Sequence, residues 1–178
     1  NDIRFTLIIY YKSKPSESKL KHLCSLVVFM KMYSGKDINV DVTLFFIDIG
    51  KKISNKKNKI LGPNNVNSGY SEIMNNKSSN VCVFRIEEME KVLVHEMTHA
   101  LKLDKGHISV PDTFFNIFNI SPKTEILLNE AYTELVALIL LLVLKSKNYN
   151  ELLKNIEKEK KHTTKQVSKI FKYYNFNN

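Results

Sequence analysis

The sequence predicts an α+β fold, in which a small N-terminal sheet precedes a mainly helical half. Two early segments, Ile3–Tyr11 and Val40–Ile49, are rich in β-branched and aromatic residues, as strands are. After about residue 86 apolar residues recur at helical spacing. The apolar share of 43% and the charged share of 25% are those of a globular chain with a core.

The N-terminal half begins with a predicted strand over Ile3–Tyr11, which ends before Pro15. A helix follows, with Ser16 as its N-cap and Gly35 at its C-terminal end. Val40–Ile49 is predicted to form the second strand. Alternating strand and helix signals in this half favour a sheet with a covering helix.

The next segment is predicted to contain short β pieces and turns. Lys51–Lys59 reads as a solvated polar loop, and Gly62 with Pro63 predicts a turn. Val66–Ser71 is a candidate edge strand, and Val81–Arg85 is a short strand after a polar turn.

The second half is predicted to be helical. The expected helices cover residues 86–103, 112–118, 123–145 after a start signal at Ser121–Pro122, and 150–174 as one helix or a pair. No linker divides the chain convincingly, so we expect a single domain over 1–178, with an α/β part (1–85) and a helical part (86–178).

The formal net charge of +9 describes a basic chain. A basic surface favours acidic peptides or proteins, anionic membranes or nucleic acid as partners, although solvated lysines in loops explain much of the excess charge equally well. Nucleic acid is an unlikely partner, because the basic residues are scattered and no aromatic-basic stacking motif accompanies them. The longest apolar run, Leu135–Leu144, is too short to span a bilayer, so no transmembrane segment is expected.

The two cysteines, Cys24 and Cys82, lie in separate apolar runs and predict buried free thiols rather than a disulfide framework. Free thiols and the lack of a signal peptide favour a reducing intracellular compartment. The chain starts at Asn1 without a methionine, which is consistent with a trimmed N-terminus.

The most informative motif is His95-Glu96-x-x-His99 within the helix predicted over 86–103. Imidazoles four residues apart lie on one helix face, one turn from each other, so both can bind one zinc ion. Glu96 lies beside the first imidazole, where its carboxylate can reach a metal-bound water. Uncharged neighbours, including Val94 and Met97, allow the helix to be buried with its ligand face open.

A catalytic zinc site takes three protein ligands and one open position. Glu130 and Glu134, four residues apart on the next long predicted helix, supply candidates in a largely apolar neighbourhood. One carboxylate can bind the metal while the other accepts the free N–H of a ligating histidine. The alternative is a pair of solvated glutamates on an amphipathic helix.

The segments "HEMTH" and "NEAYTE" together resemble the gluzincin metallopeptidases, the thermolysin-like group with two histidine ligands and one glutamate ligand. The resemblance covers residues 81–144, and it implies a minimal zincin-like catalytic domain with an edge strand over the HExxH helix. It also implies His95, His99 and Glu130 as ligands of one Zn²⁺ per chain, with Glu134 supporting His95. Within this region the sequence is similar to zinc proteases encoded by large DNA viruses.

The sequence shows no clear counterpart of the downstream histidine that stabilises the oxyanion in many gluzincins. Candidate donors or substrate contacts are His107, His162, Tyr70 and Tyr132. Gly69 allows close approach of an extended substrate to the edge strand, although an ordinary glycine turn explains it equally well.

The predicted function is therefore zinc-dependent hydrolysis of peptide bonds, with Glu96 as general base on a zinc-bound water. Whether the action is endo- or exopeptidase is left open. The alternative is a catalytically inactive, zinc-stabilised interaction domain, in which Glu96 would have no role as a base.

Overall fold

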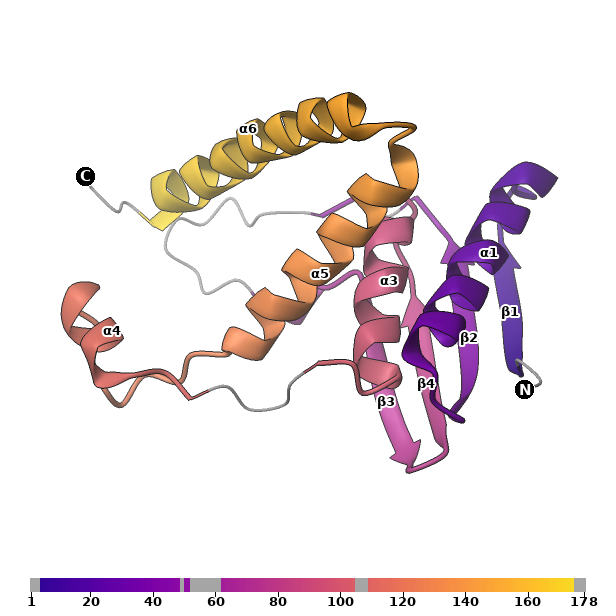
Figure 1. The fold of residues 1–178 in the computed structure, drawn as a ribbon, viewed down its shortest axis with the longest axis horizontal. Helices are drawn as coiled ribbons and strands as arrows, with labels where there is room; N and C mark the ends of the chain where they lie inside the picture. Colours follow the sequence, from indigo (N-terminus) through magenta and orange to yellow (C-terminus); the bar gives the residue numbers. More distant parts are fainter. Residues whose placement is uncertain (1–3, 49, 52–61, 105–108, 175–178) are drawn as a thin grey trace.

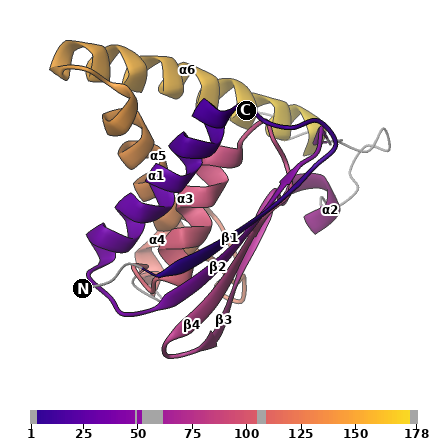
Figure 2. The same cartoon turned by 90° about the vertical axis from the view of Figure 1, so that its right-hand side faces the viewer.

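A four-stranded sheet forms one layer of the fold, and helices cover one of its faces (Figures 1 and 2). The computed structural model describes residues 4–48, 50–51, 62–104 and 109–174. Its elements are β1 (Phe5–Tyr11), α1 (Glu17–Ser34), β2 (Asn39–Phe46), α2 (Pro63–Val66), β3 (Gly69–Asn75), β4 (Ser78–Val83), α3 (Met89–Ala100), α4 (Asp112–Ile117), α5 (Leu128–Lys145) and α6 (Tyr149–Tyr174). The predicted α+β class, with a small sheet and a mostly helical C-terminal half, is confirmed.

The strands lie in the order β1-β2-β4-β3. β1, β2 and β4 are parallel, whereas β3 runs antiparallel to β4 and forms one edge. α1 makes the crossover from β1 to β2, as a parallel pair requires. β3 and β4 are joined by a tight turn at Asn76–Lys77, so the edge strand lies next to the strand that leads into α3.

The ends of α1 follow local capping chemistry. The Ser16 hydroxyl accepts a hydrogen bond from the Lys19 amide at 3.3 Å, and Gly35 takes the left-handed conformation with φ of 60°. A residue with a Cβ is disfavoured in that conformation, which is why glycine commonly ends helices. Both caps were predicted from the sequence and are confirmed.

The core lies between the sheet and the helices. β2 alternates between buried and more exposed residues, so one of its faces contributes Val40, Val42, Leu44 and Phe46 to the core. The other members come chiefly from α1, β4, α3 and α5: Leu23, Leu26, Val27, Met30, Val81, Val83, Leu93, Met97, Ala100, Ala137 and Leu141. This packing fixes α3 between the sheet and α5 (Figure 1).

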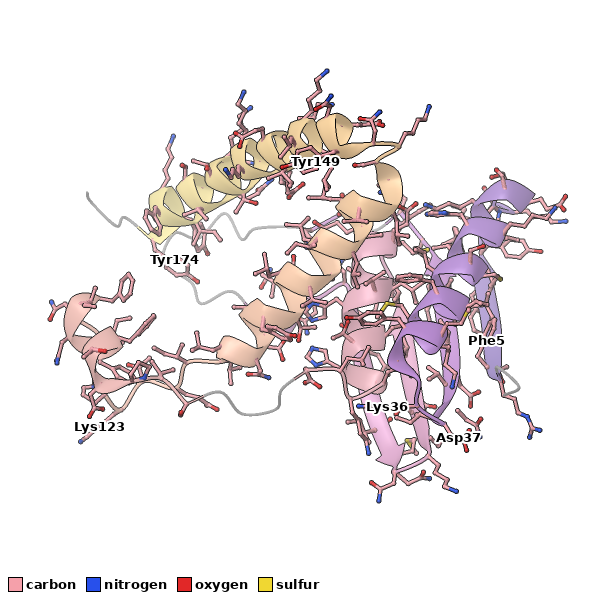
Figure 3. The ribbon with its side chains drawn as sticks, in the orientation of Figure 1. Phe5, Lys36, Asp37, Lys123, Tyr149 and Tyr174 are labelled. Atoms are coloured by element: carbon pink, nitrogen blue, oxygen red, sulfur yellow. The ribbon has the colours of Figure 1, made fainter. Side chains whose placement is uncertain are left out.

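The chain reverses direction after α5, and α6 then diverges from α5 towards its own C-terminal end (Figure 1). Figure 3 shows Tyr149 close to α5, whereas Tyr174 lies at the far end of α6. The helix is one continuous element, which resolves the predicted choice between one helix and a pair. Among the described residues, no helix combines the length and apolar character needed to cross a bilayer.

Several predicted boundaries were wrong. α5 begins at Leu128 rather than at Lys123. Residues 121–124 form a turn instead, because the Thr124 amide donates a hydrogen bond to the Ser121 carbonyl at 2.9 Å. β-branched residues at 124 and 126 also have lower helix propensity.

α3 is shorter than the predicted 86–103. The edge strand lies at 69–75, displaced from 66–71, and α2 replaces the turn predicted at Gly62–Pro63. Most of the predicted 51–59 loop lies outside the described residues.

Glu90 ties three helices together. Its side chain, only 18% exposed on α3, contacts Lys19 on α1 and lies 2.6 Å from the Lys145 ammonium on α5. Burial raises the pKa of this carboxyl, but the hydrogen bonds and charges of Lys145 and Lys19 outweigh burial and lower the pKa to about 2.

Replacing Glu90 by glutamine is expected to destabilise the fold in a pH-dependent way. A depressed folded-state pKa contributes stability above the unfolded value of 4.5, and that stability is lost as the pH falls towards 2. The shift corresponds to on the order of 3 kcal/mol, or a loss of roughly 6–12 °C in Tm near neutral pH. Thermal melts between pH 7 and pH 3 should show the two proteins converging.

The matched control is Glu17→Gln, which removes the exposed pair between Glu17 and Lys21 at 2.8 Å. Exposed pairs contribute little, so its Tm should stay within about 1 °C of the wild type. A Glu90→Gln difference that did not change with pH would contradict the ion-pair explanation.

Candidate metal centre

α3 presents two imidazoles to the same point. His95 and His99 lie one helical turn apart, and their Nε2 atoms are 3.2 Å from each other. Both side chains are mostly buried, with 17% and 16% of their surface exposed. The buried neighbours Val94, Met97 and Thr98 pack into the core and set the rotation of the helix, so the histidines face α5.

The third candidate ligand comes from the first turn of α5. The Oε2 atom of Glu130 lies 3.5 Å from the Nε2 of His95 and 3.5 Å from the Nε2 of His99. The structure thus brings together the three residues predicted as ligands.

The three atoms fit a tetrahedral metal ion. Zinc binds histidine nitrogen and carboxylate oxygen at about 2.0–2.2 Å, which separates neighbouring ligands by about 3.3–3.6 Å. The observed separations of 3.2–3.5 Å lie close to that range. Two imidazoles and one carboxylate are a donor set that zinc prefers, and three ligands leave the fourth position open.

Each histidine also has a carboxylate beside its other ring nitrogen. The Nδ1 of His99 lies 3.0 Å from the Oδ2 of Asp104. The Nδ1 of His95 lies 3.2 Å from the Oε2 of Glu134, although its N–H is not aligned well enough for a hydrogen bond. That contact is therefore mainly electrostatic. Carboxylates in these places hold the proton on Nδ1 and leave Nε2 free for a metal.

Asp104 reaches His99 because of the way α3 ends. The Leu103 amide donates to the Thr98 carbonyl at 2.9 Å, and the Lys102 amide donates to the His99 carbonyl at 2.8 Å. This is the Schellman pattern of hydrogen bonds, with Lys102 in the left-handed region at φ of 53°. The motif reverses the chain and returns it beside the last turn of the helix.

Glu134 remains charged at ordinary pH. The close contact with His95 lowers the pKa of Glu134, burial opposes the shift, and Lys91 lowers the pKa further, to about 2. The Lys91 ammonium lies 2.6 Å from the other carboxylate oxygen. For His95, burial lowers the pKa, but the charges of the neighbouring glutamates outweigh it and the pKa is raised. Protons therefore compete with a metal for His95 as the pH falls.

Glu96 points towards the edge strand. Only 9% of the surface of Glu96 is exposed, and burial raises the pKa of its carboxyl, opposed by the charge of His95 and by the nearby Ser71 side chain on β3. A carboxylate with a raised pKa takes up a proton more readily than a solvated one. Glu96 therefore has the residue type and the surroundings that a general base requires.

A cavity of about 290 Å³ opens beside these side chains. β3 and the residues before it contribute Ser68 and Gly69, and α5 contributes Glu130 and Glu134. The cavity is large enough for a side chain of a bound peptide, and the candidate base and two of the three candidate ligands, His95 and Glu130, line it.

Gly69 lies where no side chain fits. A Cβ at this position would be 2.6 Å from the Cγ1 of Val92, 2.8 Å from the carbonyl oxygen of Cys82 and 3.2 Å from the Cγ of Glu96. The backbone of β3 can therefore approach α3 closely. This contact fixes the distance between the edge strand and Glu96.

Gly69→Ala is expected to lower stability by about 1–3 kcal/mol, a shift of several degrees in Tm, because the added methyl group forces β3 and α3 apart. Thermal melts should show the change. Gly50→Ala is the matched control, since a Cβ there meets nothing within 4 Å. Equal Tm values for the two variants would contradict the close packing.

The other predicted contacts are placed differently. Gly69 faces α3, so Tyr70 faces the opposite side of the sheet, where it contacts Cys82, and 54% of its surface is exposed. Tyr132 is half-buried on α5 and makes no hydrogen bond to the described ligands. His162 is exposed on α6, 3.2 Å from the Gln166 amide. His107 lies outside the described residues.

Sequence reasoning missed three residues of the site. Asp104, Lys91 and Ser71 are not singled out by the sequence patterns. Lys91 lies one turn before His95 on α3, which is the one signal that would have placed it near the site. The position of Ser71 depends on strand register.

Comparisons with protein-family models, with curated proteins and with solved structures find no match to this chain.

Proposed function

We propose that this protein is a zinc-dependent peptidase of the gluzincin type. The observation that supports this most directly is the convergence of His95, His99 and Glu130 within 3.2–3.5 Å of one another, beside the buried carboxylate of Glu96. A structural zinc site has four protein ligands and no use for a buried base.

In the proposed mechanism His95, His99 and Glu130 would hold a zinc ion, which would polarise the substrate carbonyl and make the attacking water more acidic. Glu96 accepts the proton of that water and then gives it to the leaving amine. Glu134 and Asp104 hold the two imidazoles in the orientation that directs Nε2 at the metal. Burial of Glu96 beneath β3 keeps solvent away from the proton that it carries.

The substrate is proposed to bind along β3 as an added strand. β3 is an edge of the sheet, so none of the described strands pairs with its outer side. An extended peptide can form backbone hydrogen bonds there while its side chains enter neighbouring cavities. Close packing at Gly69 keeps this strand near Glu96.

Metal analysis and a cleavage assay test the proposal together. Protein purified without added zinc, or titrated with it, should bind about one equivalent per chain. It should cleave members of a peptide library, a chelator should stop cleavage, and zinc should restore it. Failure to take up zinc would exclude the metal centre. One equivalent of zinc without any cleavage would favour the rival function, a zinc-stabilised interaction domain.

A further inference from the structure

A second cavity lies along α3, beside the cavity that His95 and Glu130 line. It has a volume of about 360 Å³ and lies between the start of α3, α5 and α6. Glu88 and Lys91 line both cavities, so the two are neighbours. Lys91 is one helical turn, about 5 Å, before His95. Glu88 lies nearly one further turn away.

The walls of the second cavity suit a long side chain with an apolar stem. Ile86 and Met89 line it at the start of α3, and Leu138, Leu141 and Leu142 line it on α5. Methylene groups of a lysine or arginine pack on such surfaces while the charged head reaches polar groups.

Acidic residues dominate the lining of the two cavities. Seven of the 18 acidic residues line them, against four of the 27 basic ones, which gives an excess of three negative charges in a chain whose net charge is +9. A bound divalent ion leaves an excess of one. Nearby charges act more strongly than distant ones, because salt screens charges beyond about 8–10 Å.

All four of those lysines already contact a carboxylate. Lys19 and Lys145 contact Glu90, Lys91 contacts Glu134, and Lys51 contacts Glu88.

Two carboxylates of the second cavity form no ion pair with a lysine or arginine among the described residues, although the charge of Lys91 acts on Glu159. Glu159 on α6 is half-buried and makes no hydrogen bond or ion pair there. Glu87 accepts only the Lys51 backbone amide, at 3.3 Å. They lie in the same cavity as the apolar wall.

We propose that the second cavity binds a lysine or arginine side chain of the substrate, with Glu87 and Glu159 recognising its charge; this rests on the proposed peptidase function. An extended peptide advances about 3.3 Å per residue, so the basic residue lies about two or three residues from the cleaved bond. The local charge thus favours basic substrates, opposite to the acidic partners that the net charge of the whole chain favours.

Peptides carrying one lysine at successive positions, or norleucine in its place, test this recognition. Lysine at one position should raise kcat/KM about tenfold over norleucine, as a charge-assisted hydrogen bond does. In Glu87→Gln/Glu159→Gln that ratio should fall to about one. Glu157→Gln is the control, because Glu157 lies on α6 outside both cavities, with 62% of its side chain exposed. It should keep the ratio.

A binding measurement separates this inference from the peptidase proposal. Fluorescence anisotropy with Glu96→Gln should show the lysine peptide binding about tenfold more tightly than the norleucine peptide. A third peptide, with glutamate at the same position, should bind more weakly still. Adding the two glutamine substitutions should remove the difference. Cleavage without a preference for lysine would overturn the basic-residue inference and leave the peptidase intact. Selective binding without cleavage by the wild type would overturn the peptidase and keep the cavity as a basic-peptide site.

Discussion

Replacing Glu96 by glutamine is expected to leave zinc binding intact and to reduce peptide hydrolysis by about a hundred- to ten-thousand-fold. The amide keeps the shape of the carboxylate, and Glu96 is not among the three grouped ligands, but the amide cannot accept the proton of the attacking water. Zinc content by metal analysis and kcat/KM on a cleaved peptide measure the two effects separately.

Glu125→Gln is the matched control, since this exposed residue lies in the connection before α5. Its kcat/KM and zinc content should equal those of the wild type. An unchanged rate in Glu96→Gln would remove Glu96 as the base. Loss of zinc along with activity would show that Glu96 is needed for metal binding.

Zinc is expected to raise the Tm of the metal-free protein by about 5–10 °C at a free zinc concentration one hundred times the Kd, because it binds the folded state and gains about 2.7 kcal/mol by linkage. Glu130→Ala should lose most of this shift. The metal would then bind only the two histidines of α3 and would no longer join α3 to α5.

The zinc-induced Tm shifts of Asp104→Asn and Glu134→Gln should lie between those of the wild type and of Glu130→Ala, because their zinc affinity is expected to be reduced about 10–100-fold. Glu125→Ala keeps all the proposed ligands and should keep the full shift. Thermal melts at fixed free zinc measure every variant. A full shift in Glu130→Ala would contradict Glu130 as a ligand, and equal melts of the wild type with and without zinc would contradict the site itself.

Much of the sheet and of α1 could be predicted because their signals are local. Alternation along β2 reports directly which face is buried, and Ser16 and Gly35 satisfy the ends of α1 without help from distant residues. The positions of His95, His99 and Glu130 followed from helical spacing and the gluzincin resemblance. The structure brings their ligand atoms together.

The remaining parts depend on tertiary structure. Asp104 contacts His99 only because the chain reverses at Lys102, and lysine gives no signal for a left-handed conformation. Lys91 and Glu134 meet only once α5 packs on α3. The true edge strand, Gly69–Asn75, is largely exposed, so it lacks the apolar alternation that would have predicted its bounds.

If the protein is the proposed peptidase, the close packing of β3 on α3 would set the pattern of its cleavage products. For a peptide paired with β3, the fixed spacing of the backbone would determine which peptide bond lies next to Glu96. Sliding the peptide by one residue turns every side chain to the opposite face, whereas sliding by two residues restores the original faces. Secondary cleavage sites would then differ from the main site by two residues, so minor fragments would be spaced in dipeptide steps.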